Sequence, residues 1–251
     1  MGLAAPTLSL LFAAALWAGV QNALAGGGSF VTLPALILSG LDARSANIAS
    51  TIALFPGQST TGWVGRKLAA GAAGLSLTVL VVVSLVGGAL GAALLLATPS
   101  HFFARLAPWL VLFATVLFAW GSFGRRGQGA IGPRMAAAMQ FLIAVYGGYF
   151  GGGIGFLMLA ALTAAGLAVR VAGATKNILA AVMNASAVAV FLFTPGIPWG
   201  RIAVVAAGAI VGGVIGAQLL KHVDERLIRG FVIILGLALT AGLFLKGSSL
   251  G

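Results

Sequence analysis

Long apolar segments separated by short polar ones recur along the whole chain. They predict ten helical segments, over residues 4–24, 28–40, 45–64, 71–97, 104–122, 135–150, 154–168, 171–194, 200–220 and 227–246. The segments lack the alternation of polar and apolar residues that an outer-membrane barrel requires. Their length and apolar character are typical of membrane-spanning helices. The pattern therefore predicts an all-α, polytopic membrane protein.

Two of these segments begin at a run of glycines, "GGGSF" from residue 26 and "GGGIGF" from residue 151. When the sequence of residues 26–52 is aligned with that of 152–178, eleven of the 27 residue pairs are identical. We interpret this similarity as an internal duplication. It predicts a first repeat over 1–123, a linker loop over 124–134 and a second repeat over 135–251.

Composition supports a membrane protein, because 61% of the 251 residues are hydrophobic and only 7% are charged. The net charge of +11 comes from 14 basic residues that stand between the apolar segments. This distribution follows the positive-inside rule and does not indicate nucleic-acid binding. The chain has no cysteine, which excludes disulfides and thiol chemistry.

The basic residues also indicate how the chain crosses the membrane. If each glycine break lay within a single crossing, basic residues would divide seven to six between the two sides, with Lys176 counted as intramembrane. If each break is a hairpin with both ends on one face, nine lie on the linker's side and four on the other. The nine are Arg66, Lys67, Arg125, Arg126, Arg134, Arg170, Lys221, Arg226 and Arg229, and the four are Arg44, Arg105, Arg201 and Lys246. The hairpin arrangement agrees better with the positive-inside rule than a single crossing does.

Each repeat then makes an odd net number of crossings, so the repeats have opposite orientations. Inverted repeats of this kind are typical of secondary transporters. Both termini are expected outside the cell and the 124–134 loop in the cytoplasm. Residues 23–25 have the form of a signal-peptide cleavage site, but no basic residue precedes them. We therefore expect the N-terminus to be part of the structure.

The glycine runs are candidate anion-binding tips of two re-entrant hairpins. Consecutive glycines let backbone N–H groups converge, and the positive end of the following helix dipole points at the same place. The candidate residues are Gly26, Gly27, Gly28, Ser29, Gly151, Gly152, Gly153 and Gly155. Glycine also serves close helix packing, and we interpret the glycines at 71–74 and 87–91 in that way.

Polar residues in the third segment of each repeat extend this candidate site. They are Asn47, Thr51 and Gln58 in the first repeat and Lys176, Asn177 and Asn184 in the second. Any single amide or hydroxyl here is also explained as a hydrogen bond between helices. Lys176 differs, because an ionisable group inside a membrane segment indicates function by default. The alternative is that its side chain snorkels to the cytoplasmic interface.

The acidic residues exclude several chemistries. Asp42, Asp224 and Glu225 are the only acids, and all three are expected in loops. No membrane carboxylate is therefore present to bind Na⁺ or relay protons, and neither an aspartyl dyad nor an HExxH motif occurs. We expect no enzymatic activity, catalytic residue, bound metal or cofactor. An interior with a lysine, amides and hydroxyls suits a small anion.

The stretches "GGGSFVTLPALILSGLDARSANIAST" and "YGGYFGGGIGFLMLAALTAAGL", with "ATKN" after the second, resemble the TauE/SafE family of sulfite and organosulfonate exporters. The resemblance covers essentially the whole chain. Ala160 departs from it, since the first repeat has Pro34 at the equivalent position. The resemblance implies secondary transport of small sulfur oxyanions or organic acids across the inner membrane.

Two other functions remain open at this point. A passive anion channel of the same fold would have the same sequence features. A membrane anchor without transport activity is the second alternative, although the short loops leave little surface for a partner. The expected partners are the lipid bilayer and a small anionic substrate, with no nucleic acid. The sequence leaves open the exact substrate, the coupling ion and whether the protein forms a homo-oligomer.

Overall fold

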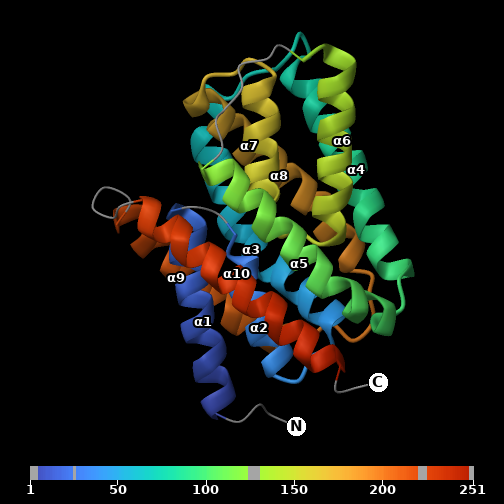
Figure 1. Ribbon diagram of the computed structural model, residues 1–251, viewed down its shortest axis with the longest axis vertical. Helices are drawn as coiled ribbons and strands as arrows, with labels where there is room; N and C mark the ends of the chain where they lie inside the picture. The colour runs from blue at the N-terminus through green and yellow to red at the C-terminus, as the bar shows by residue number, and fades with distance from the viewer. Residues whose placement is uncertain (1–4, 25–26, 124–130, 220–224, 249–251) are drawn as a thin grey trace. The chain divides into compact units, whose positions relative to one another are not determined.

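The computed structural model describes residues 5–24, 27–123, 131–219 and 225–248. This part of the chain is helical apart from its turns, and it contains one isolated β-bridge. The α-helices labelled in Figure 1 are α1 (Ala5–Leu24), α2 (Ser29–Leu38), α3 (Ala43–Gly65), α4 (Leu77–Ala97), α5 (Ser100–Phe123), α6 (Pro133–Tyr149), α7 (Ile154–Ala164), α8 (Val169–Phe191), α9 (Trp199–Leu219) and α10 (Glu225–Ser248). A short 3₁₀-helix, η1 (Arg66–Leu68), follows α3. The expected all-α class is confirmed.

Nearly all helix bounds lie within a few residues of the expected segments, but the expected start at residue 71 is wrong. Residues 71–76 form a tight turn before α4. Ala72 and Leu75 exchange backbone hydrogen bonds of 3.1 and 2.9 Å across it. Between them, Ala73 and Gly74 have positive φ angles of 52° and 81°. The glycines at 71–74 therefore belong to a turn rather than to helix packing.

The chain forms two compact units, and each contains segments from both halves of the sequence. Unit 1 consists of residues 1–57, 98–116 and 194–251, and unit 2 consists of 58–97 and 117–193. In unit 1, α1 and α2 pack with α9 and α10. In unit 2, α6, α7 and α8 pack with one another, and α4 packs against α6 and α8. The hairpin helices of each half therefore pack against a helix of the other half.

The main contact of unit 1 joins α1 and α9 without intervening side chains. A Cβ atom on Gly212 would lie only 1.9 Å from the carbonyl oxygen of Leu16, and one on Gly208 would lie 2.7 Å from that of Phe12. Glycine is required at such positions for the two backbones to approach. The pairs Phe12–Gly208 and Leu16–Gly212 advance together, so the two helices run parallel.

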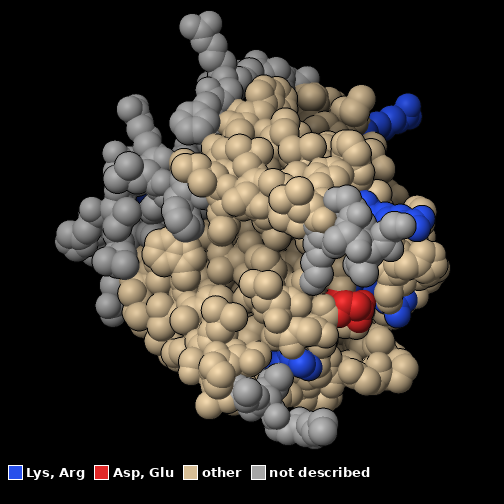
Figure 2. Space-filling view, turned by 60° about the horizontal axis from the view of Figure 1, so that its bottom comes forward, with Lys and Arg blue, Asp and Glu red and all other residues tan. Residues whose placement is uncertain are grey.

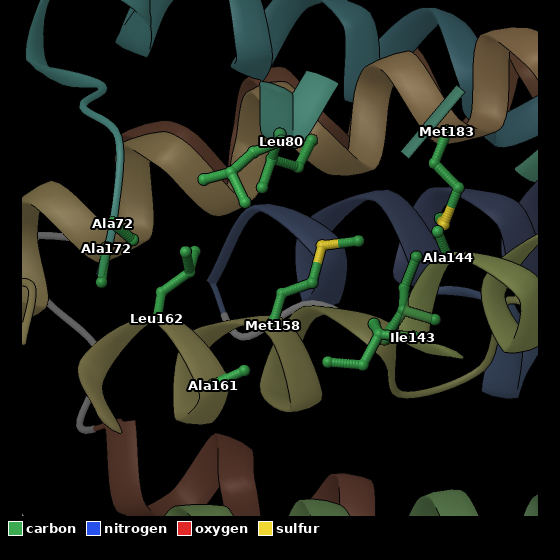
Figure 3. Packing of buried hydrophobic residues seen from close by; sticks show 11 residues of the cluster. Ala72, Leu80, Ile143, Ala144, Met158, Ala161, Leu162, Ala172 and Met183 are labelled. Atoms are coloured by element: carbon green, nitrogen blue, oxygen red, sulfur yellow. The ribbon is translucent and has the colours of Figure 1, made fainter. Parts of the chain in front are cut away.

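Unit 2 uses the same kind of packing. A Cβ atom on Gly91 of α4 would lie 2.1 Å from the carbonyl oxygen of Val145 in α6. One on Gly88 would lie 2.5 Å from the carbonyl oxygen of Met183 in α8. The interpretation of the glycines at 87–91 as packing residues is confirmed. Beside this contact, buried side chains of α4, α6, α7 and α8 form a hydrophobic cluster that includes Leu80 and Met158 (Figure 3).

Four helical segments are long and apolar enough to cross a membrane: Leu77–Ala97, Ser100–Leu117, Val169–Phe191 and Trp199–Gly216. Among the shorter apolar helices in the described part of the chain are α2 and α7. Large apolar side chains such as Val86, Leu90 and Leu94 are exposed along α4, four residues apart. Figure 2 shows that charged side chains are few on one face and lie toward its right-hand and lower part. These features are those of a multi-pass membrane protein.

Candidate functional site

In unit 2, α6 and α7 form a hairpin that turns at its glycines. The amides of Phe150 and Gly151 both donate to the Tyr146 carbonyl, at 2.9 and 3.4 Å, and thereby end α6. α7 then packs back against α6. The Ile131 amide, just before α6, donates to the carbonyl of Ala164, the last residue of α7, at 3.5 Å. This hairpin therefore begins and finishes at the same end of its unit.

In unit 1, α1 and α2 form the corresponding hairpin (Figure 1). Because α1 and α9 run parallel, both helices begin at the same end of the unit. Arg201, in the first turn of α9, donates from its guanidinium to the Ser39 carbonyl at 3.0 Å. Ser39 directly follows α2, so α2 ends near the start of α1. Arg44, at the start of α3, donates to the Thr98 carbonyl at 2.9 Å. This bond holds the loop between α4 and α5 next to the start of α3.

The two hairpins share their local backbone conformation at an offset of 126 residues. Gly27 and Gly153, just before α2 and α7, have positive φ angles of 80° and 74°. The amide three residues after each of them donates back to its carbonyl, at 2.9 and 3.1 Å. Gly40 and Gly166, just after these helices, have φ angles of 94° and 91°. Glycine adopts this left-handed conformation without the steric cost of a Cβ atom, so the repeated glycines produce the same turns twice.

The second tip presents backbone N–H groups. Among the described residues, no acceptor is found for the amides of Gly152, Gly153, Ile154 and Gly155. Unpaired N–H groups at the start of a helix, together with its dipole, make a place where an anion is stabilised. Gly152 is buried against the ring of Phe150, so a side chain at this position would clash with that ring.

Lys176 of α8 reaches this second tip. Its Nζ lies 3.6 Å from the position that a Cβ atom on Gly155 would occupy, in the first turn of α7. The side chain is partly buried, and within the described part of the chain its ammonium group has no hydrogen-bond or ion-pair partner. The sequence of unit 2 contains no Asp or Glu at all. The tip therefore combines N–H dipoles and a cation with no carboxylate of its own unit.

The other predicted residues of unit 2 lie on α8 and on the end of α3. The Asn184 side chain donates to the Gln58 side-chain oxygen at 2.5 Å. These two residues are equivalent in the repeats, since their numbers differ by 126. Asn177 is partly buried, and its carbonyl oxygen packs 3.1 Å from the position of a Cβ atom on Gly62. Gln58 thus belongs to the unit of the second hairpin, whereas Asn47 and Thr51 of the same helix belong to unit 1.

The first tip is held by two residues that the sequence analysis missed. Gln21, in the last turn of α1, donates from Nε2 to the Gly27 carbonyl at 3.0 Å. Thr32 of α2 lies 2.6 Å, between hydroxyl oxygens, from Ser50 of α3 and also donates to the Gly28 carbonyl at 3.3 Å. The available signal was the presence of a glutamine and a threonine in otherwise apolar segments on either side of the glycines.

The remaining predicted residues of unit 1 are described in part. Asn47 is buried in α3, and Thr51 donates from its hydroxyl to the Asn47 carbonyl at 3.0 Å within the same helix. Gly28 and Ser29 begin α2 at the tip. Gly26 lies outside the described residues. Within those residues, no group of three His, Cys, Asp or Glu side chains could hold a metal ion.

Comparison with known proteins agrees with a transport function. A probable membrane transporter protein of Haemophilus influenzae is 28% identical over 93% of this chain and 93% of its own length. A probable membrane transporter protein of Sinorhizobium, ORF9, is 28% identical over 92% of this chain and 90% of its length. The probable membrane transporter protein YfcA of Escherichia coli is 26% identical over 94% and 89%.

The family model of the sulfite exporter TauE/SafE matches residues 11–243, nearly the whole chain. It therefore includes the second hairpin, the first hairpin from residue 11 onward, both glycine tips and Lys176. The resemblance noted in the sequence is thus confirmed: this chain is a membrane transporter that belongs to the TauE/SafE sulfite exporter family.

Proposed function

We propose that the protein is a secondary transporter that exports small sulfur-containing anions, such as sulfite or organosulfonates. Each glycine tip would offer its backbone N–H groups to the substrate, and Lys176 would supply the countercharge at the second tip. Asn47, Thr51, Gln58, Asn177 and Asn184 would supply further hydrogen bonds during the transport cycle. The proposal fits an anion rather than a cation, because the tips offer donors and a positive charge.

The contact between Lys176 and the second tip carries this proposal. An ammonium group next to the first turn of α7, within 3.6 Å of the Gly155 Cβ position, adds a full charge to the partial charge of the N–H groups. A partly buried cation with no carboxylate in its unit is costly unless an anion accompanies it. A bound oxyanion would accept hydrogen bonds from the tip and neutralise Lys176 at the same time.

The hairpins support an inverted-repeat topology in the cell membrane. Both hairpins return to the end of the unit from which they start, and three crossings by the remaining helices would then give each half an odd net number. The loops with Arg44 and Arg201 then face the outside together with both termini, and the 124–134 linker faces the cytoplasm. In Gram-negative cells this membrane is the inner membrane. Alternating access would expose the tips to one side and then to the other.

The test is anion flux in proteoliposomes loaded with sulfite. Replacing Lys176 by methionine keeps the length of the side chain but removes its charge, and we expect sulfite flux to fall at least tenfold. Lys176→Arg keeps the charge and should retain part of the flux. Lys67→Met is the matched control, because Lys67 is an exposed lysine of the same unit.

Two results would count against the proposal. Wild-type flux in Lys176→Met would remove this residue from the substrate site. Flux that does not saturate and shows no counterflow would indicate a passive channel instead of a transporter, since a carrier with alternating access shows both.

A further inference from the structure

The side chain of Gln21 lies at the first glycine tip, where only half of its amide group is paired. The residue is 1% exposed. Its Nε2 atom donates to the Gly27 carbonyl at 3.0 Å and lies 3.5 Å from the position of a Cβ atom on Gly27. Its Oε1 atom is buried and accepts no hydrogen bond within the described residues. The carboxamide thus presents an unpaired acceptor beside the tip.

An unpaired buried acceptor needs a physical explanation. Leaving such a group without a donor costs about 1–3 kcal/mol, and the large majority of buried polar atoms are paired. Methionine has a similar volume and would avoid this cost. The N–H half of Gln21 is explained by Gly27, but its oxygen is not explained by any contact within the described part of the protein.

The start of α2 provides the complementary groups. Gly28 is the N-cap of this ten-residue helix, and Ser29 is its first residue. Gly28 packs tightly, because a Cβ atom here would lie 2.9 Å from the Ala18 carbonyl oxygen. The positive end of the helix dipole lies at this tip, next to Gly27, whose carbonyl accepts the hydrogen bond from the Gln21 side chain. A ligand bound at this tip would contact backbone N–H groups, which suit an anionic oxygen. It would also contact Gln21 Oε1, which suits a hydrogen-bond donor.

We propose that Gln21 is a specificity residue that selects oxyanions carrying their own hydrogen-bond donor. Such ligands include hydrogensulfite and sulfonates with a hydroxyl or amino group. The sulfite dianion and simple alkylsulfonates lack this donor and would leave Oε1 unpaired. The inference rests on the proposed transport of sulfur anions, and it narrows the substrate class. A site built to bond a ligand donor discriminates strongly against the analogue that lacks it.

The experiment compares two ligands of nearly equal size on the full-length protein in detergent, by thermal shift and calorimetry. Isethionate carries a terminal hydroxyl group where propanesulfonate carries a methyl group. We expect wild-type protein to bind isethionate at least about tenfold more tightly, the factor that corresponds to one hydrogen bond. Gln21→Met keeps the side-chain volume but removes the acceptor, together with the donor to the Gly27 carbonyl. Loss of that donor should change the affinity for both ligands alike, and loss of the acceptor should make the two affinities equal.

Gln140→Met is the matched control. Gln140 of α6 is also buried, donates from Nε2 to the Ser84 hydroxyl at 2.8 Å and has an unpaired Oε1, but it lies in the middle of a helix rather than at a glycine tip. This variant should keep the wild-type preference for isethionate. A preference that disappears in Gln140→Met as well would overturn the assignment to Gln21.

The measurement on wild-type protein does not depend on the folding of any variant. It distinguishes failure of the role of Gln21 from failure of the proposed function. Equal affinity for both ligands overturns the role of Gln21 and leaves anion binding intact, with solvent as the partner of Oε1. A preference that survives in Gln21→Met also overturns it. Binding of neither ligand, nor of sulfite, overturns the proposed function and this inference together.

Discussion

Lys176 combines a positive charge with a partly buried position and no carboxylate in its unit. Such a residue lowers the stability of the empty protein, because desolvation of an ammonium group is not offset by a partner. Proteins keep costly groups of this kind where activity depends on them. Stability and transport should therefore respond in opposite directions when the charge is removed.

We accordingly predict that Lys176→Met unfolds at a higher temperature than wild type in the absence of anions, by the equivalent of about 1 kcal/mol. Sulfite should raise the unfolding temperature of wild type and leave that of the variant unchanged. Both quantities come from thermal unfolding in detergent with and without sulfite. A variant that is less stable than wild type would indicate a structural role for Lys176, as expected for a lysine that snorkels to the interface.

Sequence reasoning located some of the candidate site at this scale and missed the rest for a physical reason. Lys176 could be found because a charge in an apolar segment is rare and costly. Gln21 and Thr32 could not, because amides and hydroxyls in membrane helices serve many ordinary interhelical hydrogen bonds. Only their distances to the glycine tip distinguish them. The pairing of Gln58 with Asn184 likewise depends on where the helices meet.

At the scale of elements, Asp42 directly precedes Ala43, the first residue of α3. Its carboxylate accepts hydrogen bonds from the amides of Arg44 and Ser45, both at 3.1 Å, as an N-cap residue does. Burial works to raise the pKa of Asp42, but hydrogen bonds from Ser45 and Arg44 and the charge of Arg44 outweigh it and lower the pKa below its usual value. The charged form therefore stabilises the folded helix start.

This direction of the pKa shift fixes the pH dependence. Because the folded pKa is depressed, the contribution of Asp42 is complete above its unfolded pKa near 3.9 and is lost as the pH falls through the lower folded value. Asp42→Asn keeps a capping side chain without the charge. We expect wild type to be more stable than this variant at about pH 6, by up to about 1 kcal/mol, and the difference to vanish toward about pH 2. Thermal unfolding across this range measures it, and a constant difference would contradict the prediction.

The contact between α1 and α9 allows a second prediction at this scale. Gly212 has no room for a methyl group, because its Cβ position lies 1.9 Å from the Leu16 carbonyl oxygen. The adjacent Gly213 has no atom within 4 Å of its Cβ position. We expect Gly212→Ala to destabilise the protein by about 1–3 kcal/mol, since the two backbones must separate. Gly213→Ala is the control and should be neutral or slightly stabilising, because alanine favours a helix more than glycine does. Equal unfolding temperatures of the two variants would show that this contact does not hold the helices together.

The positions and bounds of the helices were the part of the fold that the sequence predicted best. Continuous apolar segments fix where a membrane helix begins and ends, because unpaired backbone groups are excluded from lipid. The error at 71–76 shows the limit of this reasoning. That segment reads as a continuation of an apolar helix, yet Gly71 and Gly74 favour a turn that only the backbone hydrogen bonds between Ala72 and Leu75 reveal.

At the scale of the whole molecule, the two compact units do not coincide with the two halves of the sequence. Each unit takes a hairpin from one half and the helix packed against it from the other. Sequence similarity reports which segments are equivalent, but not which segments pack together. The matching pairs α1 with α9 and α6 with α4 could not be predicted from the order of the segments, because they depend on long-range glycine contacts.

The hairpins lead to a prediction about topology in the membrane. α2 ends near the start of α1, since Arg201 at the start of α9 bonds to Ser39 and α9 runs parallel to α1. The N-terminus and the loop after α2 should therefore lie on the same side of the membrane. The linker, residues 124–134, should lie on the opposite, cytoplasmic side because of its basic residues.

The chain contains no cysteine, so single cysteines can be introduced and labelled without background. We expect Gly2→Cys and Leu41→Cys to react with a membrane-impermeant maleimide in intact cells. Gln128→Cys, in the linker, should react only after the membrane is permeabilised, and it serves as the control for intact cells. If Leu41→Cys were protected while Gly2→Cys reacted, α1 and α2 together would form one crossing instead of a hairpin. The halves would then have the same orientation, and the two glycine tips could not enter the membrane from opposite sides.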